Sequence, residues 1–240
     1  MSLDLVTIAV AAFAAGAVAA VAGFGIGSIL TPLLALQLGP RLAIAAVSIP
    51  HFAATALRFV MLRQAVDWKV LRVFGIASAA GGLAGALLHS QAGSQTLRIV
   101  FAMLLLLAAG SELFGLASRV RLPAVGALAA GGVSGFFGGL VGNQGGIRSA
   151  AMLSLPLGRD AFVATATATG LIVDAARMPV YFATSSSALL AAWPIVVIAT
   201  GGALAGTVAG RALLGGIPER IFRRIVAVLL VLLAGFMLVS

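Results

Sequence analysis

"VAGFGIGSILTPLLAL", from Val21 to Leu36, interrupts an apolar run with three glycines, a serine, a threonine and a proline. A second stretch, "LVGNQGGIRSAAMLSLPLG" from Leu140 to Gly158, does the same in the second half of the chain. The apolar pieces that follow, 28–38 and 147–157, reach only about 16 Å as helices, which is half of a bilayer. The two stretches therefore predict helices that are broken inside a membrane.

The composition indicates a protein that is surrounded by lipid. Of its 240 residues, 62% are hydrophobic and 9% are charged, and its mean hydropathy is +1.18. A soluble domain carries roughly 25% charged residues. Eight apolar segments are long enough to cross a bilayer: 3–22, 42–62, 70–89, 97–114, 123–141, 161–183, 188–214 and 221–239. The sequence predicts an all-α polytopic membrane protein that forms one unit over 1–240.

The first segment imitates a signal peptide through its small residues. It carries Asp4 and has no basic residue before its apolar run, so we interpret it as a retained membrane helix.

The basic residues predict the sides of the membrane. The net charge of +9 comes from arginines and lysines at the ends of apolar runs, and they form no stripe with exposed aromatic residues. This argues against a nucleic-acid partner. The connections 63–72, 115–122 and 211–224 are basic and are expected to be cytoplasmic. The connections 89–96 and 184–188 contain no Lys or Arg and are expected outside.

This assignment starts the first half of the chain outside and the second half inside. At a constant offset of 119 residues, several glycines and one arginine also match: Gly16 and Gly135, Gly23 and Gly142, Gly27 and Gly146, Gly39 and Gly158, Arg58 and Arg177. These matches predict two inverted-topology repeats, 1–118 and 119–240, each with a broken glycine-rich helical hairpin and three transmembrane helices. Chance matching among abundant small residues is the alternative.

A break in a membrane helix is tolerated inside protein or beside a water-filled cavity. The short helix after each break points free amide groups and a partial positive charge back at the break, an arrangement that suits an anion. The candidate substrate-binding residues are Gly23, Gly25, Gly27, Ser28 and Thr31 in the first half, and Asn143, Gln144, Gly145, Gly146, Arg148 and Ser149 in the second. The runs "GGVSGFFGGLVG" and "GGALAGTVAG" predict close helix packing instead.

Four ionisable residues inside the membrane segments have more than one interpretation. Arg148 costs at least about 2.5 kcal/mol in a membrane helix, so it binds the anion, pairs with a carbonyl group or snorkels to the surface. Asp174 and Arg177 are spaced i, i+3 and form either a structural pair or a gate or proton site. His51 is either a satisfied buried imidazole or part of the transport mechanism. Arg58 is expected to snorkel to the cytoplasmic surface.

The chain resembles the TauE/SafE sulfite exporter family, also called TSUP. The resemblance rests on "AGFGIGSILTPLLAL" (22–36) and on "GGLVGNQGGIRSAAMLSLPLGRDAFVATATATGLIVDAARMPVYF" (138–182). It implies two related halves and a location in the bacterial inner membrane, with small sulfur-containing anions as substrates. It places Gly23, Gly25, Gly27, Asn143, Gln144, Gly145, Gly146 and Arg148 in the motif regions of the family.

Together these features predict a secondary transporter, an exporter of small sulfur-containing anions such as sulfite or organosulfonates. It is expected to work by alternating access around a site at mid-depth. An anion channel with the same site is the alternative. An enzyme is disfavoured because HExxH, paired aspartates and a Ser/His/Asp arrangement on one helix are missing. With no cysteine and no His/Glu metal spacing, no metal or cofactor is expected. The sequence allows a homodimer without requiring one.

Overall fold

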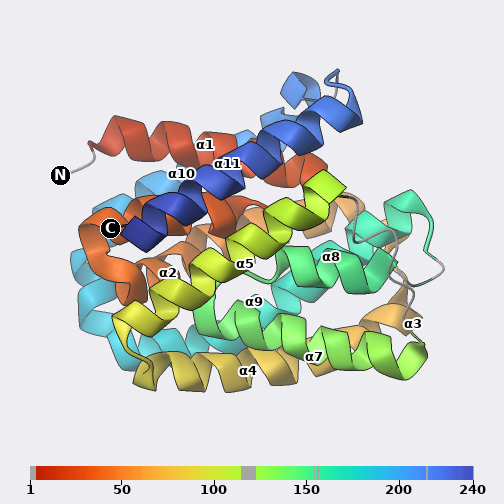
Figure 1. The fold of residues 1–240 in the computed structure, drawn as a ribbon, viewed down its shortest axis with the longest axis horizontal. Helices are drawn as coiled ribbons and strands as arrows, with labels where there is room; N and C mark the ends of the chain where they lie inside the picture. Colours follow the sequence, from red (N-terminus) through yellow and green to blue (C-terminus); the bar gives the residue numbers. More distant parts are fainter. Residues whose placement is uncertain (1–3, 115–122, 154, 156, 215, 240) are drawn as a thin grey trace.

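The computed structural model describes residues 4–114, 123–153, 155, 157–214 and 216–239, and over these residues it contains helices and no strands (Figure 1). A 3-10 turn at Arg63–Ala65 precedes the short helix Trp68–Val70, and a π-helical turn at Leu71–Gly75 follows it. The helices are α1 (Leu5–Ala22), α2 (Ile26–Leu62), α3 (Trp68–Val70), α4 (Ile76–Gln91), α5 (Ser94–Phe114), α7 (Ala124–Val141), α8 (Gly145–Leu153), α9 (Arg159–Ala191), α10 (Trp193–Leu214) and α11 (Glu219–Val239).

Among the described residues, seven helical stretches are long and apolar enough to cross a membrane. The eighth predicted span, 123–141, forms α7, whose apolar part Val125–Val141 falls just short of that length. Large apolar side chains such as Val6, Leu107 and Leu232 are more than half exposed on the outside of the bundle. Water would penalise such a surface and lipid would not. The chain is thus a multi-pass membrane protein, as the composition predicts.

Two predicted helix boundaries coincide with kinks inside longer helices. The boundary expected between 28–38 and 42–62 lies at Gly39, which leaves the helical conformation with φ 73° and ψ 157° inside α2. The connection expected at 184–188 contains Ser185, where φ −139° and ψ 19° interrupt the helical conformation of α9. The polar side chain before this kink bonds back to the helix: the Thr184 hydroxyl donates to the Val180 carbonyl at 2.8 Å.

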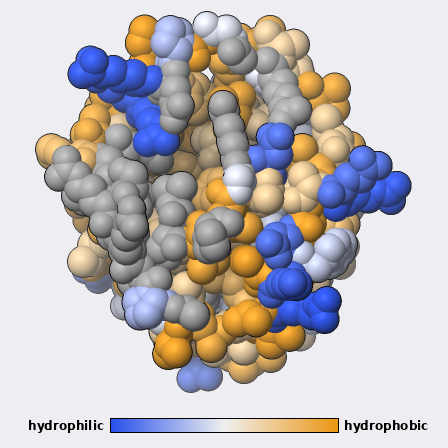
Figure 2. All heavy atoms as spheres, turned by 90° about the vertical axis from the view of Figure 1, so that its right-hand side faces the viewer, coloured by the Kyte–Doolittle hydropathy of each residue, from blue (hydrophilic) through white to orange (hydrophobic). Residues whose placement is uncertain are grey.

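The connections divide between two ends of the molecule (Figure 1). The start of α1, the end of α11 and the turn between α4 and α5 lie at the left in Figure 1, whereas α3 and the start of α11 lie at the right. Figure 2 shows hydrophilic side chains on the right-hand face. The exposed basic residues of α3, α11 and the turns beside α3 are Arg63, Lys69, Arg72, Arg220, Arg223 and Arg224. This distribution agrees with the predicted sides, while the connection 115–122 lies outside the described residues.

The glycine-rich runs pack helices closely. α1 packs against α10, and α4 packs against α7. A Cβ added at Gly202 of α10 would lie 2.6 Å from the carbonyl oxygen of Ala9, and one at Gly85 of α4 would overlap the carbonyl group of Phe136. Backbones can approach this closely only where side chains are missing. The predicted small-residue packing faces are confirmed.

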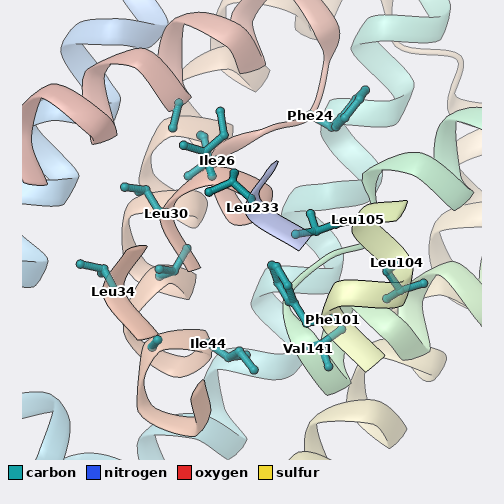
Figure 3. Close-up of a cluster of buried hydrophobic side chains, with 14 of the residues drawn as sticks. Phe24, Ile26, Leu30, Leu34, Ile44, Phe101, Leu104, Leu105, Val141 and Leu233 are labelled. Carbon is teal, nitrogen blue, oxygen red and sulfur yellow. The ribbon is translucent and has the colours of Figure 1, made fainter. Parts of the chain in front are cut away.

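An apolar cluster lies around the first part of α2 (Figure 3). Ile26, Leu30 and Leu34 of α2 belong to the same buried cluster as Phe101 of α5 and Val141 at the end of α7. All five side chains are at most 6% exposed. Because a packed core resists displacement, this cluster fixes where α2 begins and where α7 ends. These two helix ends form the candidate site.

Candidate functional site

Each broken helix ends in a left-handed glycine. α1 ends at Gly23 (φ 79°), whose amide donates to the Ala19 carbonyl at 3.0 Å. α7 ends at Gly142 (φ 75°), whose amide donates to the Gly138 carbonyl at 3.0 Å. An L-residue with a side chain would pay roughly 1–2 kcal/mol for this conformation. Glycine at both positions therefore lets the chain turn inside the protein and begin a new helix, α2 or α8.

The two breaks contact each other. A Cβ added at Gly27 would lie 2.5 Å from the carbonyl oxygen of Gly142, and one at Gly145 would overlap the Phe24 side chain. The Ser28 hydroxyl donates to Asn143 Oδ1 at 3.2 Å across the contact. A hydrogen bond thus joins residues 115 positions apart in the chain. The first turn of α2 therefore lies beside the first turn of α8.

A small cavity of about 10 Å³ lies where the breaks meet. Its volume is about what one water molecule needs. It is lined by Phe24, Gly25, Gly27, Ser28, His51, Gly142, Asn143, Gln144, Gly145 and Arg148. Phe24 and Gly142 line the cavity but are not among the predicted binding residues. Phe24 lies between two predicted binding glycines, and Gly142 directly precedes Asn143 and matches Gly23 in the predicted repeat, so both positions carried a signal.

The remaining predicted binding residues lie nearby but do not line this cavity. Gly23 presents its carbonyl group to Arg148, and the buried Thr31 hydroxyl has no hydrogen bond among the described residues. A Cβ on Gly146 would face Ala108 of α5 at 3.1 Å. Ser149 is half-buried on α8. These four residues therefore lie around the cavity without lining it.

Arg148 is the least satisfied of the buried arginines. Its side chain is buried, with the residue only 2% exposed, yet it makes a single long hydrogen bond from Nη2 to the Gly23 carbonyl at 3.3 Å. Its Nε and Nη1 atoms, like Asn143 Nδ2 and Gln144 Nε2, have no partner among the described residues. A buried donor left unpaired costs about 1–3 kcal/mol. This region of the protein therefore holds several unused donors that an anion could accept.

Arg58 is buried, so the expectation that it snorkels to the surface is wrong. It is 5% exposed, and its Nη1 donates to the Ala19 carbonyl at 2.5 Å while Nε donates to Thr167 Oγ1 at 3.1 Å. The Ala19 carbonyl also accepts from the Gly23 amide, so Arg58 adds a second donor at the end of α1. Together with the bond to Thr167, this contact holds the guanidinium in the interior.

Asp174 binds both Arg177 and His51 in the interior of the protein. Its Oδ1 accepts from Arg177 Nε at 3.0 Å and lies 2.8 Å from Nη2, while its Oδ2 lies 2.6 Å from His51 Nδ1. Arg177 also donates from Nη1 to the Gly138 carbonyl at 2.5 Å, at the end of α7. The pair of Asp174 and Arg177 is thus part of the structural support of the second break. A gating or proton-transfer function for these residues stays a prediction.

The charges near the site do not cancel. Three buried arginines, Arg58, Arg148 and Arg177, are accompanied by one buried carboxylate, that of Asp174. Asp174 pairs with Arg177, which leaves Arg58 and Arg148 without a carboxylate. Arg58 donates to the Ala19 carbonyl and to Thr167, whereas Arg148 keeps two unused donor atoms among the described residues. Within the described residues, no three His, Cys, Asp or Glu side chains gather in a way that could hold a metal ion. The site suits an anion.

The fold and the site together define a polytopic helical membrane protein with a buried cationic site between two broken helices. The sequence model of the family described as sulfite exporter TauE/SafE matches residues 8–237. The chain belongs to this family, and it is therefore a membrane transporter of small substrates and not an enzyme. No curated protein and no solved structure matches the chain.

Proposed function

We propose that the protein is a secondary transporter that exports small sulfur-containing anions, such as sulfite or organosulfonates, across the bacterial inner membrane. The observation that carries the proposal is Arg148, a buried guanidinium with unused donors in the wall of a cavity where two helices begin. Arginine donors and helix N-termini are the groups that bind oxyanions in proteins. Arg148 binds the anion, and the amide groups of the two breaks surround it.

Alternating access around this cavity is the proposed mechanism. The cavity holds about one water molecule, so an oxyanion enters only when the two breaks separate. A site of this small volume favours a carrier over the alternative anion channel, which needs a continuous path wide enough for the anion. An interior-negative membrane potential favours export by about 2.3 kcal/mol per negative charge for each 100 mV.

The two breaks are proposed to belong to inverted repeats, 1–118 and 119–240, within one unit. In support of this, the bounds of α1 (Leu5–Ala22) and α7 (Ala124–Val141) differ by 119 residues at both ends. "GGLAG" on α4 packs on α7, and "GGALAG" on α10 packs on α1. α1 begins at the left end of the molecule and α7 at the right (Figure 1). A repeat places equivalent faces of the two halves on one cavity, which is the arrangement that alternating access uses.

Purified protein in liposomes tests the proposal. Wild-type protein is expected to give saturable flux of sulfite or sulfoacetate, with counterflow when the anion is present on both sides. Arg148→Met should abolish this flux, whereas Arg72→Ala, which removes an exposed arginine, should leave it intact. Folded wild-type protein that moves no small anion would refute the transporter, and single-channel currents would favour the channel.

The oligomeric state is a separate question. A homodimer stays a prediction, which the mass of the protein in detergent or in nanodiscs can test.

A further inference from the structure

His51 forms part of the wall of the cavity and contacts the buried carboxylate behind it. The residue follows Pro50 in α2 and is 9% exposed. It lines the same cavity as Arg148. Its Nδ1 lies 2.6 Å from Oδ2 of Asp174 on α9. An imidazole between an anion site and a buried carboxylate can exchange a proton with the cavity.

The hydrogen bonds determine which ring nitrogen is available. Oδ1 of Asp174 accepts from Arg177 Nε at 3.0 Å and also lies 2.8 Å from Nη2. Arginine is a permanent cation and donates only, so this contact keeps Asp174 ionised and able only to accept. His51 Nδ1 must then carry the hydrogen that it shares with Oδ2. The acceptor of the neutral ring is Nε2, and it is the atom that can take a proton from water in the cavity.

Asp174 itself is a poorer proton acceptor. Both of its oxygens already accept hydrogen bonds, from Arg177 and from His51. A proton on either oxygen would displace one of these donors and leave a buried group unpaired, which is costly. His51 is therefore the buried titratable side chain best placed to change its protonation.

The surrounding charges couple this proton to the anion. The ionic groups that face His51 are Asp174 and Arg177 on α9 and Arg148 on α8, with Arg58 two turns further along its own helix. Three arginines against one carboxylate already leave excess positive charge, so a further proton on His51 is disfavoured while the cavity holds no anion. An anion on Arg148 removes that penalty. Each ligand thus favours binding of the other.

We propose that one proton binds to Nε2 of His51 together with each anion, so that the protein couples transport of the anion to a proton. This inference rests on the proposed anion site. On binding, the Nε2 lone pair accepts the proton from water in the cavity, and Nδ1 keeps its own hydrogen on Asp174. On release, the anion leaves and the buried arginines again repel the proton on His51. Nε2 then gives the proton back to water on the side to which the cavity opens.

Calorimetry on the purified wild-type protein tests the coupling without a variant. Sulfoacetate is the probe, because both of its acid groups are ionised throughout the neutral range. Titrations in two buffers that differ in ionisation enthalpy report the protons taken up, and we expect up to one proton per anion. In the pH range where His51 is neutral in the free protein and protonated in the anion complex, the affinity should fall by about tenfold for each pH unit. Sulfoacetate binding without proton uptake and without this pH dependence would overturn the inference.

A pair of histidine variants locates the proton. His51→Asn keeps a donor for Asp174 but cannot accept the proton, so the number of protons per anion should fall from one to zero, whatever the remaining affinity. His89→Asn is the control, since His89 is also buried but donates from Nδ1 to the Leu140 carbonyl at 2.9 Å, away from the cavity. It should keep the wild-type ratio. A His51→Asn protein that still takes up one proton per anion would refute the assignment.

The two proposals fail in different ways. Wild-type protein that shows counterflow of sulfoacetate but no proton uptake leaves the transporter intact and removes the coupling. Wild-type protein that is folded and neither binds nor moves any small sulfur-containing anion removes the anion site, and the coupling with it.

Discussion

Arg58 and Arg177 make equivalent hydrogen bonds in the two halves of the protein. Arg58 Nη1 donates to the Ala19 carbonyl and Arg177 Nη1 donates to the Gly138 carbonyl, each at 2.5 Å. The two arginines are 119 residues apart, and so are the two carbonyl groups. Both α1 and α7 end inside the protein, where water cannot satisfy their last carbonyl groups. The equivalence supports the proposed repeat and gives each arginine the same physical task.

The two arginines should nevertheless differ in their effect on stability. Arg177→Met leaves Asp174 without its cation, and breaking a buried pair in this way costs about 3–5 kcal/mol. Arg58→Met removes hydrogen bonds from a charged donor and should cost about 1.5–3 kcal/mol. Unfolding in detergent measures both. The double variant with Asp174→Asn should recover part of the loss of Arg177→Met, and equal destabilisation with and without that change would contradict the pairing.

Arg148→Met should separate binding from stability. The variant removes a buried cation whose Nε and Nη1 have no partner among the described residues, so the protein without its anion should unfold at the same or a higher temperature. Loss of two hydrogen bonds to a charged ligand should weaken anion binding by at least about tenfold. Calorimetry and thermal unfolding on the same sample measure the two effects. A large loss of stability would show that Arg148 is structural.

Gly27→Ala should prevent the two breaks from closing on each other. Its new methyl group would lie 2.5 Å from the Gly142 carbonyl oxygen, so we expect loss of transport with only moderate destabilisation. Gly110→Ala in α5 is the control, since an added Cβ there meets nothing within 4 Å. It should be neutral or stabilise the helix by about 0.5–1 kcal/mol. Unimpaired flux in Gly27→Ala would show that this contact is not needed in the transport cycle.

The second break should be the more rigid of the two. Side chains donate to three successive carbonyl groups before it: Arg177 to Gly138, Tyr181 to Gly139 and His89 to Leu140. At the first break, side chains donate to two carbonyl groups, Arg58 to Ala19 and Arg148 to Gly23. One additional bond of about 0.5–1.5 kcal/mol at the second break should make the first break open about two- to tenfold more often.

Thiol labelling can compare the two breaks, because the chain contains no cysteine. Phe24 and Asn143 are both 6% exposed, so Phe24→Cys and Asn143→Cys form a matched pair. We expect the first to react faster with a small thiol reagent in the absence of substrate. Equal rates, or a faster second site, would contradict the predicted asymmetry.

The sides of the membrane can be tested with the same chemistry. Gln95 is exposed at the start of α5 and Lys69 is exposed on α3, and the start of α5 and α3 lie at opposite ends of the molecule (Figure 1). In intact cells, an impermeant reagent should label Gln95→Cys and reach Lys69→Cys only after permeabilisation. The reverse pattern would show that the cytoplasmic and outer sides are assigned the wrong way round.

The sequence by itself determined the features that depend on local chemistry. Composition places the chain in lipid, and the length of 147–157 excludes a full crossing. Gly23 and Gly142 mark the breaks because their left-handed backbone favours a residue without a side chain. The same local reasoning predicts an interruption at 184–188, and the backbone leaves the helical conformation there at Ser185.

Only the tertiary structure decided which distant groups meet. His51 and Asp174 are 123 residues apart in the chain, and Ser28 and Asn143 are 115 apart, so no spacing along the sequence reveals either contact. Arg58 is buried with its donors on Ala19 of α1 and Thr167 of α9, which its position near a predicted helix end could not indicate. Side-chain partners depend on how the helices pack, whereas the break in a single helix depends on its own residues.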